Sequence, residues 1–304
     1  MTFQHEALIY EGRDGFLAGT LPFIRDGLGS GEPVLIAVQH DKIRLLQDRL
    51  DTAAGDVTFA DMAEIGANPN RIIPVWRDFV AAAAGRPVRG IGEPVWAGRG
   101  PAEVVECQLH EALLNVAFAH DEGFRLMCPY DAETLDPAVV HEARCSHPHL
   151  SCKLGARPSA DYRTDRLLDP FESPLPPPGS HAEVLAFERD GLSDVRRAVT
   201  TAADRAGLDG IRARGLVQAV NELAANSARH GGGNGVLRIW REAEMLVCEV
   251  RDRGRIKDPL AGRRRPGLES LEGRGLWIVN QVCDLVQLRS GADGTVVRAL
   301  MRTA

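Results

Sequence analysis

The segment from Asp169 to Ser180 is rich in proline, and it limits most strongly what this chain can fold into. Proline fixes φ and lacks a backbone N–H, so such a segment cannot lie inside a helix or a central strand. We therefore expect residues 161–180 to form an extended, semi-rigid linker. The 304 residues would then form two domains, residues 1–160 and 181–304, each long enough to bury its own core.

Short apolar runs alternate with helical patterns before the linker. The patterns predict strands at 7–10, 33–38, 57–59 and 124–128, and helices at 15–28, 43–50, 72–84 and 101–120. Continuous apolar strands that alternate with helices are typical of a parallel sheet covered on both faces. The glycine-rich stretch 27–31 follows a helix rather than a strand, so we interpret it as a turn, and no GxxxxGK[ST] phosphate loop occurs.

Residues 221–231 predict a helix that places Glu222 and Asn226 one turn apart on one face. The opposite, apolar face is formed by Leu216, Val217, Val220, Leu223 and Ala224. A carboxylate can orient or deprotonate an attacking hydroxyl, and an amide oxygen can ligate Mg²⁺. On most helices such a pair is simply solvated, so the spacing alone does not identify a site.

Further motifs follow in order along the chain. A strand at 247–251 runs into Asp252-Arg253-Gly254, and a basic, Gly/Pro-rich stretch covers 255–272. Gly273-Arg274-Gly275-Leu276 then begins an apolar helix, where glycines let backbone N–H groups approach a phosphate. The patterns at 286–289 and 295–300 predict a β-hairpin.

This order of motifs resembles the ATP-binding domain of the GHKL superfamily, whose α/β sandwich is called the Bergerat fold. The resemblance covers about residues 181–302 and implies that ATP and Mg²⁺ bind there. It implies that Glu222 is the general base and Asn226 the Mg²⁺ ligand. It also implies that Asp252 accepts a hydrogen bond from the adenine amino group, with support from Thr295. The other implied nucleotide-binding residues are Gly254, Gly273, Arg274, Gly275 and Leu276.

The basic stretch, which would be the lid over ATP, departs from this superfamily at one point. The first glycine motif often reads Asp-x-Gly-x-Gly, whereas Arg255-Ile256 follows Gly254 here, so we expect the lid to hinge differently. The cluster Arg263-Arg264-Arg265 is either a solvated loop or a source of guanidinium groups that reach the γ-phosphate when the lid closes.

Several phrases of the N-terminal part resemble the MEDS sensory domain, a RecA-like α/β module named from methanogen and methylotroph regulators. They are His5 to Tyr10, Gly90 to Trp96, His110 to Asn115, Cys128 to Asp131 and Ser146 to Pro148. The resemblance spans about residues 3–155 and implies a sensor, but the residues do not identify its ligand. The expected fold class is therefore α/β, with a RecA-like parallel α/β sensory domain and a C-terminal Bergerat-fold sandwich.

Cysteines and histidines gather at the end of the sensory domain. Cys145, His147, His149 and Cys152 could ligate zinc, but their spacing is not that of a CxxC…CxxC site. We interpret this segment as metal-free, with zinc as the alternative. For His5, His110 and Glu111 we expect core or capping roles, with ligand contacts as the alternative. The six cysteines are expected to be reduced thiols.

Three functions remain for the ATP site. A sensor histidine kinase needs an exposed phospho-acceptor histidine on a helical hairpin, and only His110-Glu111 offers the residues, within the sensory domain. The compact fusion instead resembles bacterial anti-sigma-factor serine/threonine kinases. This resemblance implies phosphorylation of a STAS-type anti-anti-sigma partner and binding of a sigma factor. The alternatives are a nucleotide-dependent module that sequesters a partner without phosphoryl transfer, and an atypical histidine kinase.

Charge and hydropathy exclude some partners. The net charge is −6 with a pI of about 5.9 and no long basic run, so we expect no direct contact with nucleic acid. The N-terminus does not resemble a signal peptide, and no apolar run of about 18 residues occurs, so we expect a cytoplasmic protein without membrane contact. The sequence leaves open whether the chain forms a homodimer.

Overall fold

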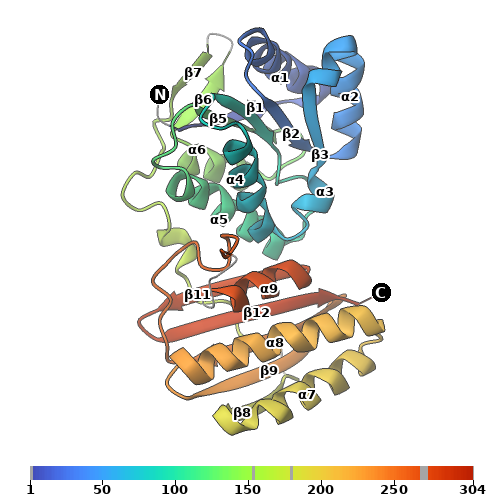
Figure 1. The fold of residues 1–304 in the computed structure, drawn as a ribbon, viewed down its shortest axis with the longest axis vertical. Coiled ribbons are helices and arrows are strands. Elements are labelled where there is room, and N and C mark those ends of the chain that lie inside the picture. The colour runs from blue at the N-terminus through green and yellow to red at the C-terminus, as the bar shows by residue number, and fades with distance from the viewer. Residues whose placement is uncertain (1–2, 153–154, 179–180, 268–272, 304) are drawn as a thin grey trace. The chain divides into compact units, whose positions relative to one another are not determined.

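The computed structural model describes residues 3–152, 155–178, 181–267 and 273–303 (Figure 1). It divides into two compact units, residues 1–168 and 169–304. Unit 1 contains a seven-stranded, mainly parallel sheet, and unit 2 contains a separate five-stranded antiparallel sheet. This confirms the expected α/β class with two domains.

Unit 1 alternates strands and helices as the apolar pattern predicts. Its strands are β1 (Gln4–Tyr10), β2 (Val34–Val38), β3 (Val57–Asp61), β4 (Val88–Gly92), β5 (Phe124–Asp131), β6 (His149–Cys152) and β7 (Gly155–Pro158). Its helices are α1 (Gly12–Gly29), α2 (His40–Leu50), α3 (Met62–Ile65), α4 (Ile72–Ala82), α5 (Pro101–Ala117) and α6 (Pro137–Ser146), and the short 3₁₀ turns are η1 (Asp51–Asp56) and η2 (Pro69–Arg71).

The strand order is β3-β2-β4-β5-β1-β6-β7, and every pair is parallel except β6 and β7. The predicted parallel sheet thus carries one antiparallel strand, β7, at its edge. Strands β6 and β7 each have only four residues, and all four residues of β7 are exposed, so neither carries the continuous apolar run that marks a buried strand. Helix α1 continues to Gly29, so the turn expected at 27–31 begins three residues later than predicted, at Ser30.

Glycine allows one helix to approach strand β4 closely. A Cβ atom at Gly90 or Gly92 would lie 2.7–2.8 Å from the ring of Trp76, which α4 places against the strand. Ile91 points to the opposite face, into the core under α1 and α2. The sequence Gly-Ile-Gly thus lets one face accept an indole while the other face is filled by a branched side chain.

Unit 2 is an α/β sandwich. Its strands are β8 (Glu183–Glu188), β9 (Asn234–Glu242), β10 (Met245–Asp252), β11 (Leu285–Gly291) and β12 (Gly294–Arg302). Its helices are α7 (Leu192–Arg205), α8 (Gly210–His230) and α9 (Arg274–Val282), and η3 (Asp169–Phe171) and η4 (Arg189–Gly191) are short 3₁₀ turns. The strand order is β11-β12-β10-β9-β8, and all pairs are antiparallel.

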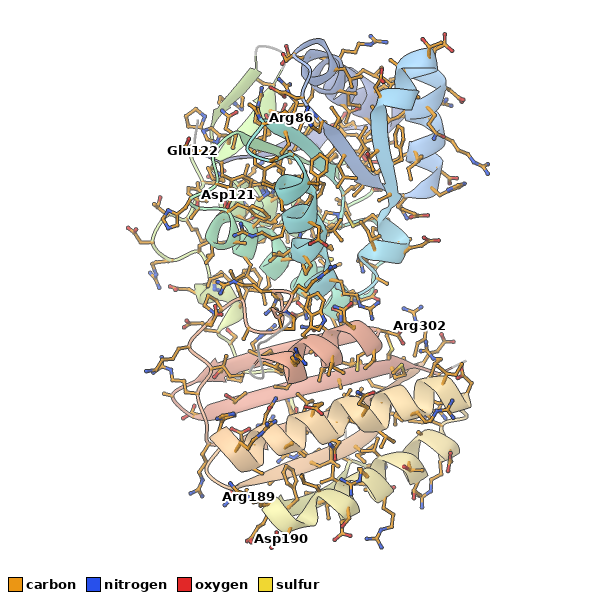
Figure 2. All side chains as sticks on the ribbon, viewed as in Figure 1. Arg86, Asp121, Glu122, Arg189, Asp190 and Arg302 are labelled. Carbon is orange, nitrogen blue, oxygen red and sulfur yellow. The ribbon has the colours of Figure 1, made fainter. Side chains whose placement is uncertain are left out.

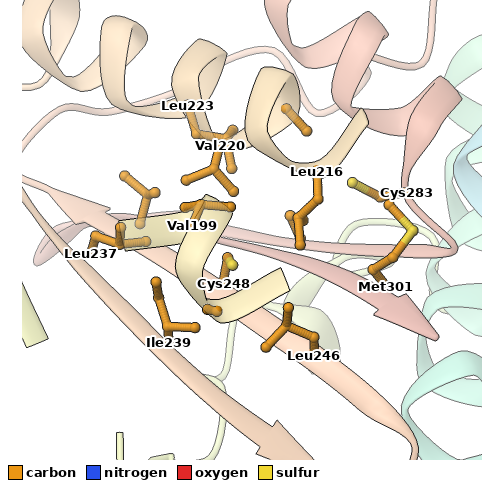
Figure 3. Packing of buried hydrophobic residues seen from close by; sticks show 14 of the residues in the cluster. Val199, Leu216, Val220, Leu223, Leu237, Ile239, Leu246, Cys248, Cys283 and Met301 are labelled. Carbon is orange, nitrogen blue, oxygen red and sulfur yellow. The ribbon is translucent and has the colours of Figure 1, made fainter. Parts of the chain in front are cut away.

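The core of unit 2 lies between its sheet and its helices (Figure 3). Leu216, Val220 and Leu223 of α8 are at most 3 % exposed and pack against strand residues such as Leu237 and Cys248. Val217 is only partly buried at the edge of this core, so the apolar face of α8 lies close to where its spacing predicts. The sequence pattern did not predict β9, which is the first strand of the hairpin that β10 completes.

The other face of this sheet holds a buried carboxylate. Glu249 of β10 is 0 % exposed and accepts hydrogen bonds from Arg251 Nε at 2.5 Å and from Arg298 Nε at 2.8 Å. Arg298 also donates to the carbonyl of Pro176, so part of the Pro-rich segment contacts this face. Burial alone would raise the pKa of Glu249, but the hydrogen bonds from Arg251 and Arg298 outweigh it and lower the pKa.

We expect Glu249→Gln to lower the stability of unit 2 by about 3 kcal/mol at pH 7, because removing one partner of a buried ion pair leaves the other uncompensated. The folded-state pKa of Glu249 is lower than its unfolded value, so its stabilisation is present above the unfolded pKa and disappears as pH falls through the folded one. The gap between wild type and variant should therefore narrow below about pH 4. Calorimetry of the full chain across pH would measure it.

Glu183→Gln is the matched control. Glu183 forms an ion pair with Arg205 in which both side chains are about 60 % exposed or more, so its loss should cost under about 1 kcal/mol. Equal destabilisation by the two variants would contradict the role assigned to Glu249.

Most charged side chains lie on the outside, as Arg86, Glu122, Arg189 and Asp190 illustrate (Figure 2). Among the helices in the described ranges, none is both long and apolar enough to span a membrane.

Candidate functional site in unit 2

Helices α8 and α9 bring the first pair of predicted site residues together with the second glycine motif. Glu222 and Asn226 lie one turn apart on α8, and both side chains are partly buried. A Cβ atom at Gly275, in the first turn of α9, would lie 3.1 Å from both Glu222 Oε2 and Asn226 Nδ2. The N-terminus of α9 therefore faces the carboxylate and the amide directly, and any side chain at 275 would fill the space between them.

Asp252 connects the end of β10 to α8. Its Oδ2 accepts the hydroxyl proton of Ser227 at 2.6 Å, and its Oδ1 accepts the backbone N–H of Gly254 at 2.7 Å. An ionised carboxylate has about four acceptor positions, so both oxygens keep capacity for another donor, such as an amino group. The carboxylate is partly buried, as a group that contacts both protein and ligand must be.

Two glycines make room for Asp252. A Cβ atom at Gly231, which follows α8, would lie 2.4 Å from Cγ of Asp252. Gly294 has φ of +110°, and a Cβ atom there would lie 2.1 Å from the carbonyl oxygen of Asp252. Side chains at either position would push the aspartate away, so these glycines are part of the site even though they carry no functional group.

Thr295 fixes the backbone at the end of the first glycine motif, Asp252-Arg253-Gly254. Its hydroxyl donates to the carbonyl of Gly254 at 2.9 Å, and it lies 2.8 Å from the Ser290 hydroxyl. Because the proton of Thr295 is used on Gly254, Ser290 donates to Thr295 and in turn accepts the N–H of Ile256 at 2.8 Å. The residue after Arg255, where a second glycine is often found, is thus fixed by Ser290.

The second glycine motif forms the start of α9. Gly273 has φ of +80° and precedes the helix, whose first residue is Arg274. The unpaired N–H groups of a helix N-terminus favour an anion, so a phosphate fits here. Arg274 is exposed, whereas Leu276 is partly buried and packs against the core of unit 2.

The described part of the basic stretch, 255–267, contacts α9. Asn280 donates to the carbonyl of Gly262 at 2.9 Å, and Gly262 has φ of +74°, with Leu276 and Asn280 where its Cβ would be. Arg263 is buried, and Arg264 pairs with Asp258 at 3.2 Å. The remainder of the expected lid, residues 268–272, lies outside the described residues, and the role of the arginines at the γ-phosphate stays a prediction.

Asn226 already has one hydrogen bond. Arg229 donates to its Oδ1 at 3.1 Å. An amide oxygen has two lone pairs, so this bond leaves one for a cation. A hard cation such as Mg²⁺ accepts such an oxygen together with phosphate oxygens and water. The donor set therefore fits Mg²⁺, provided the phosphates lie at the start of α9.

Sequence reasoning missed two residues of this site, Ser227 and Ser290. Ser227 lies in the Glu222 helix, one turn before its end, and a hydroxyl there can only be recognised once β10 is known to end beside it. Ser290 lies near the end of β11, after its apolar residues, and in the sequence it looks like an ordinary turn residue.

The histidines and cysteines of unit 1 are arranged differently from the expected grouping. Cys145 is buried with its Sγ 3.6 Å from His141 Nε2, and Cys152 is exposed and donates to the carbonyl of Gly155. Of the four residues considered for zinc, only His147 belongs to a group of possible ligands in the described residues, together with His5, Glu111 and Cys128. His110 is only 1 % exposed.

Unit 1 also contains a cleft of about 390 Å³ beside the ends of β1, β2 and β5. Its lining includes Tyr10, Arg13, Asp41, Lys42 and Asp131. Lys42 contacts the buried Glu93 at 2.5 Å, and Tyr10 donates to the same carboxylate at 2.9 Å. Burial raises the pKa of Glu93, although Lys42 partly offsets it. Carboxyl ends of parallel strands are where open α/β sheets bind ligands, so this cleft is the candidate sensory site.

Comparison with protein families matches both units. Residues 4–148 match the MEDS model, described as MEthanogen/methylotroph, DcmR Sensory domain, and residues 185–301 match the histidine kinase-like ATPase domain. The chain therefore joins a MEDS sensory domain to a histidine kinase-like ATPase domain, as the resemblances implied. The second match implies ATP binding, and the combination is that of a signalling regulator.

One solved structure with similarity is the crystal structure of the RsbU and RsbW domains of Rv1364c from Mycobacterium tuberculosis. It is 17 % identical with a TM-score of 0.32, and the match covers 40 % of this chain and 32 % of that one. At this TM-score the similarity supports no conclusion about this chain. No curated protein matches this chain.

We expect Asp252→Ala to weaken ATP binding and to remove the preference for ATP over GTP, because the resemblance implies that this carboxylate accepts from the adenine amino group. Ser227→Ala removes only one orienting hydrogen bond and should cost about 1 kcal/mol, or about fivefold in affinity. Calorimetric titration measures both. The control is Asp258→Ala, which deletes an exposed carboxylate of the basic stretch. An Asp252→Ala variant that folds and still prefers ATP would remove Asp252 from the adenine contact.

Proposed function

We propose that unit 2 transfers the γ-phosphoryl group of Mg-ATP to a Ser or Thr hydroxyl of a STAS-type anti-anti-sigma partner, in a chain that also binds a sigma factor. The observation that carries the proposal is the position of Gly275, which places the start of α9 against Glu222 and Asn226. Phosphate, cation and base would then meet within one small space, which is what in-line phosphoryl transfer requires.

Each residue has a distinct part in this proposal. Asp252 and Thr295 orient the adenine end, and Gly254, Gly273, Arg274, Gly275 and Leu276 shape the nucleotide pocket. Asn226 holds Mg²⁺, which when bound neutralises charge on the phosphate oxygens. Glu222 lies one turn away on the same helix face and orients the incoming hydroxyl or accepts its proton.

The burial of His110 argues against autophosphorylation of this chain at that residue. His110 lies on α5 of unit 1 and is 1 % exposed, so its imidazole cannot meet a γ-phosphate without local unfolding. We therefore infer that the acceptor is on another protein. The resemblance to anti-sigma-factor kinases supports a Ser or Thr of a STAS protein as that acceptor.

A module that binds nucleotide and sequesters a partner without transfer is the second candidate. It would need Asp252 and the glycine motifs but no base. The presence of Glu222 beside Gly275 favours transfer, because within the described part of the chain this carboxylate has no ion pair or side-chain hydrogen bond that would give it a structural role.

We expect Glu222→Gln to lower phosphoryl transfer by about 10²–10⁴-fold while ATP affinity stays nearly unchanged, because the amide keeps the shape but cannot accept a proton. The measurement is mass spectrometry of purified full chain with Mg-ATP and candidate STAS proteins. Glu188→Gln, an exposed residue at the end of β8, is the control. Partner binding by wild type with no transfer would establish the sequestering function instead, and acid-labile phosphate on His110 would restore the histidine-kinase alternative.

Asn226→Ala should weaken ATP binding in the presence of Mg²⁺ by more than it does in EDTA, because the variant lacks the amide oxygen that we assign to Mg²⁺. Arg229→Ala is the sharper companion, since it frees the second lone pair of the Asn226 oxygen. We expect it to leave Mg-dependent binding unchanged or stronger. Equal losses with and without Mg²⁺ for Asn226→Ala would assign the cation to other ligands.

A further inference from the structure

Four buried side chains of the types that ligate metals converge inside unit 1. They are His5 of β1, Glu111 of α5, Cys128 of β5 and His147, which directly follows α6. All four are at most 1 % exposed, and one ligand atom from each lies within 4.8 Å of all the others. We call these residues the His5 cluster. The function proposed for unit 2 does not use them.

The distances within the His5 cluster are close to those of a filled site. His5 Nε2 lies 3.0 Å and His147 Nε2 3.3 Å from Glu111 Oε2, and Cys128 Sγ lies 3.4 Å from His5 Nε2. Ligands at 2.0–2.3 Å from a tetrahedral zinc lie about 3.3–3.8 Å from one another. The cluster therefore needs only small side-chain movements to surround an ion.

The hydrogen bonds around the cluster fix the tautomers of both imidazoles. His147 Nδ1 lies 2.7 Å from the carbonyl of Ala143, which can only accept, so Nδ1 carries the proton. Asn115 donates through Nδ2 to the carbonyl of Ser146, so its Oδ1 accepts from His5 Nδ1 at 3.1 Å. In the tautomer with the proton on Nδ1, the lone pair of each ring is on Nε2, and both Nε2 atoms face Glu111. Such an outer hydrogen bond on each histidine is typical of metal ligands.

The Nε2 atoms of both imidazoles thus converge on the buried Glu111 carboxylate, an arrangement that a cation would satisfy. In the described residues, neither His147 Nε2 nor Glu111 Oε1 has a hydrogen bond of good geometry. A single proton can bridge only one of these contacts.

We propose that His5, Glu111, Cys128 and His147 bind one first-row divalent transition-metal ion, with Zn²⁺ the best match. Two imidazole nitrogens, one carboxylate oxygen and one thiolate sulfur are all zinc ligands, and four protein ligands are typical of a closed structural site. The charges also balance, since one carboxylate and one thiolate neutralise a divalent ion in a buried place. A bound cation would stabilise the Cys128 thiolate that this balance requires.

The site would join parts of the sensory domain that are distant in sequence. It links the central strands β1 and β5 to α5 and to the start of β6, where the antiparallel edge begins. The ion would therefore stabilise the centre of unit 1. Because all ligands are buried, the ion must enter while the domain folds.

The test uses the full chain, unfolded and reduced, then refolded with Co²⁺ or Zn²⁺ in the absence of nucleotide and Mg²⁺. We expect one ion per chain after removal of excess metal. The cobalt form should show the absorption of a tetrahedral site and a thiolate-to-cobalt charge-transfer band. Cys128→Ser should lose the band, whereas Cys145→Ser, which changes a buried cysteine of the same unit outside the His5 cluster, should keep it.

Asn115→Leu separates positioning from ligation. It removes the hydrogen bond that orients His5 but no ligand, so metal affinity should fall by about 10–100-fold while the charge-transfer band keeps its position. An unchanged affinity would contradict the tautomer argument for His5.

X-ray absorption of zinc-loaded wild type covers the case in which Cys128→Ser does not fold. One sulfur and three nitrogen or oxygen neighbours are expected. Refolded wild type without stoichiometric metal, a band lost in Cys145→Ser but kept in Cys128→Ser, or two sulfur neighbours would each overturn the proposal. None of these results depends on phosphoryl transfer, so they leave the function proposed for unit 2 unaffected.

Discussion

The Asp252 carboxylate is the interaction on which the geometry of the ATPase domain depends. It accepts from Ser227 of α8 and from the backbone of Gly254, while Gly231 and Gly294 leave the space that it occupies. Hydrogen bonds to an ionised acceptor are about twice as strong as neutral ones, so this single group fixes the end of β10 against α8. The position of Glu222 and Asn226 relative to the adenine end follows, because they lie on that same helix.

The glycine motifs act through distances rather than through any chemical group. Gly275 lies where a side chain would contact both Glu222 and Asn226, and Gly262 lies where one would contact Leu276 and Asn280. The first close approach opens the space for phosphate, and the second lets the described part of the basic stretch lie on α9. The glycine motif at the start of α9, which the sequence analysis related to phosphate binding, is therefore also required for the packing of α9 against α8.

The sequence predicts the ATPase domain better than the sensory domain, and the reason is physical. The motifs around Glu222, Asp252 and Gly275 each sit at the end of a regular element, so local periodicity locates them and the resemblance supplies their order. Ser227 and Ser290 escape this reasoning because their role depends on which strand ends nearby. The β6–β7 edge and β9 escape it because short or partly exposed strands carry a weak periodic signal.

The His5 cluster could not be found from spacing at all. Zinc motifs are recognised when pairs of ligands are close in sequence, and the sequence therefore drew attention to Cys145 and Cys152. In the fold, neighbouring parallel strands place His5 beside Cys128, and α5 covers them with Glu111.

The two sites of the chain also differ in exposure for a reason that follows from their chemistry. Glu222 and Asn226 must exchange substrate and are partly exposed, whereas a closed four-ligand site works only when water is excluded, and its ligands are buried. We propose the open cleft beside Lys42 as the place where a signal acts, and the His5 cluster as the group that keeps β1 and β5 in place.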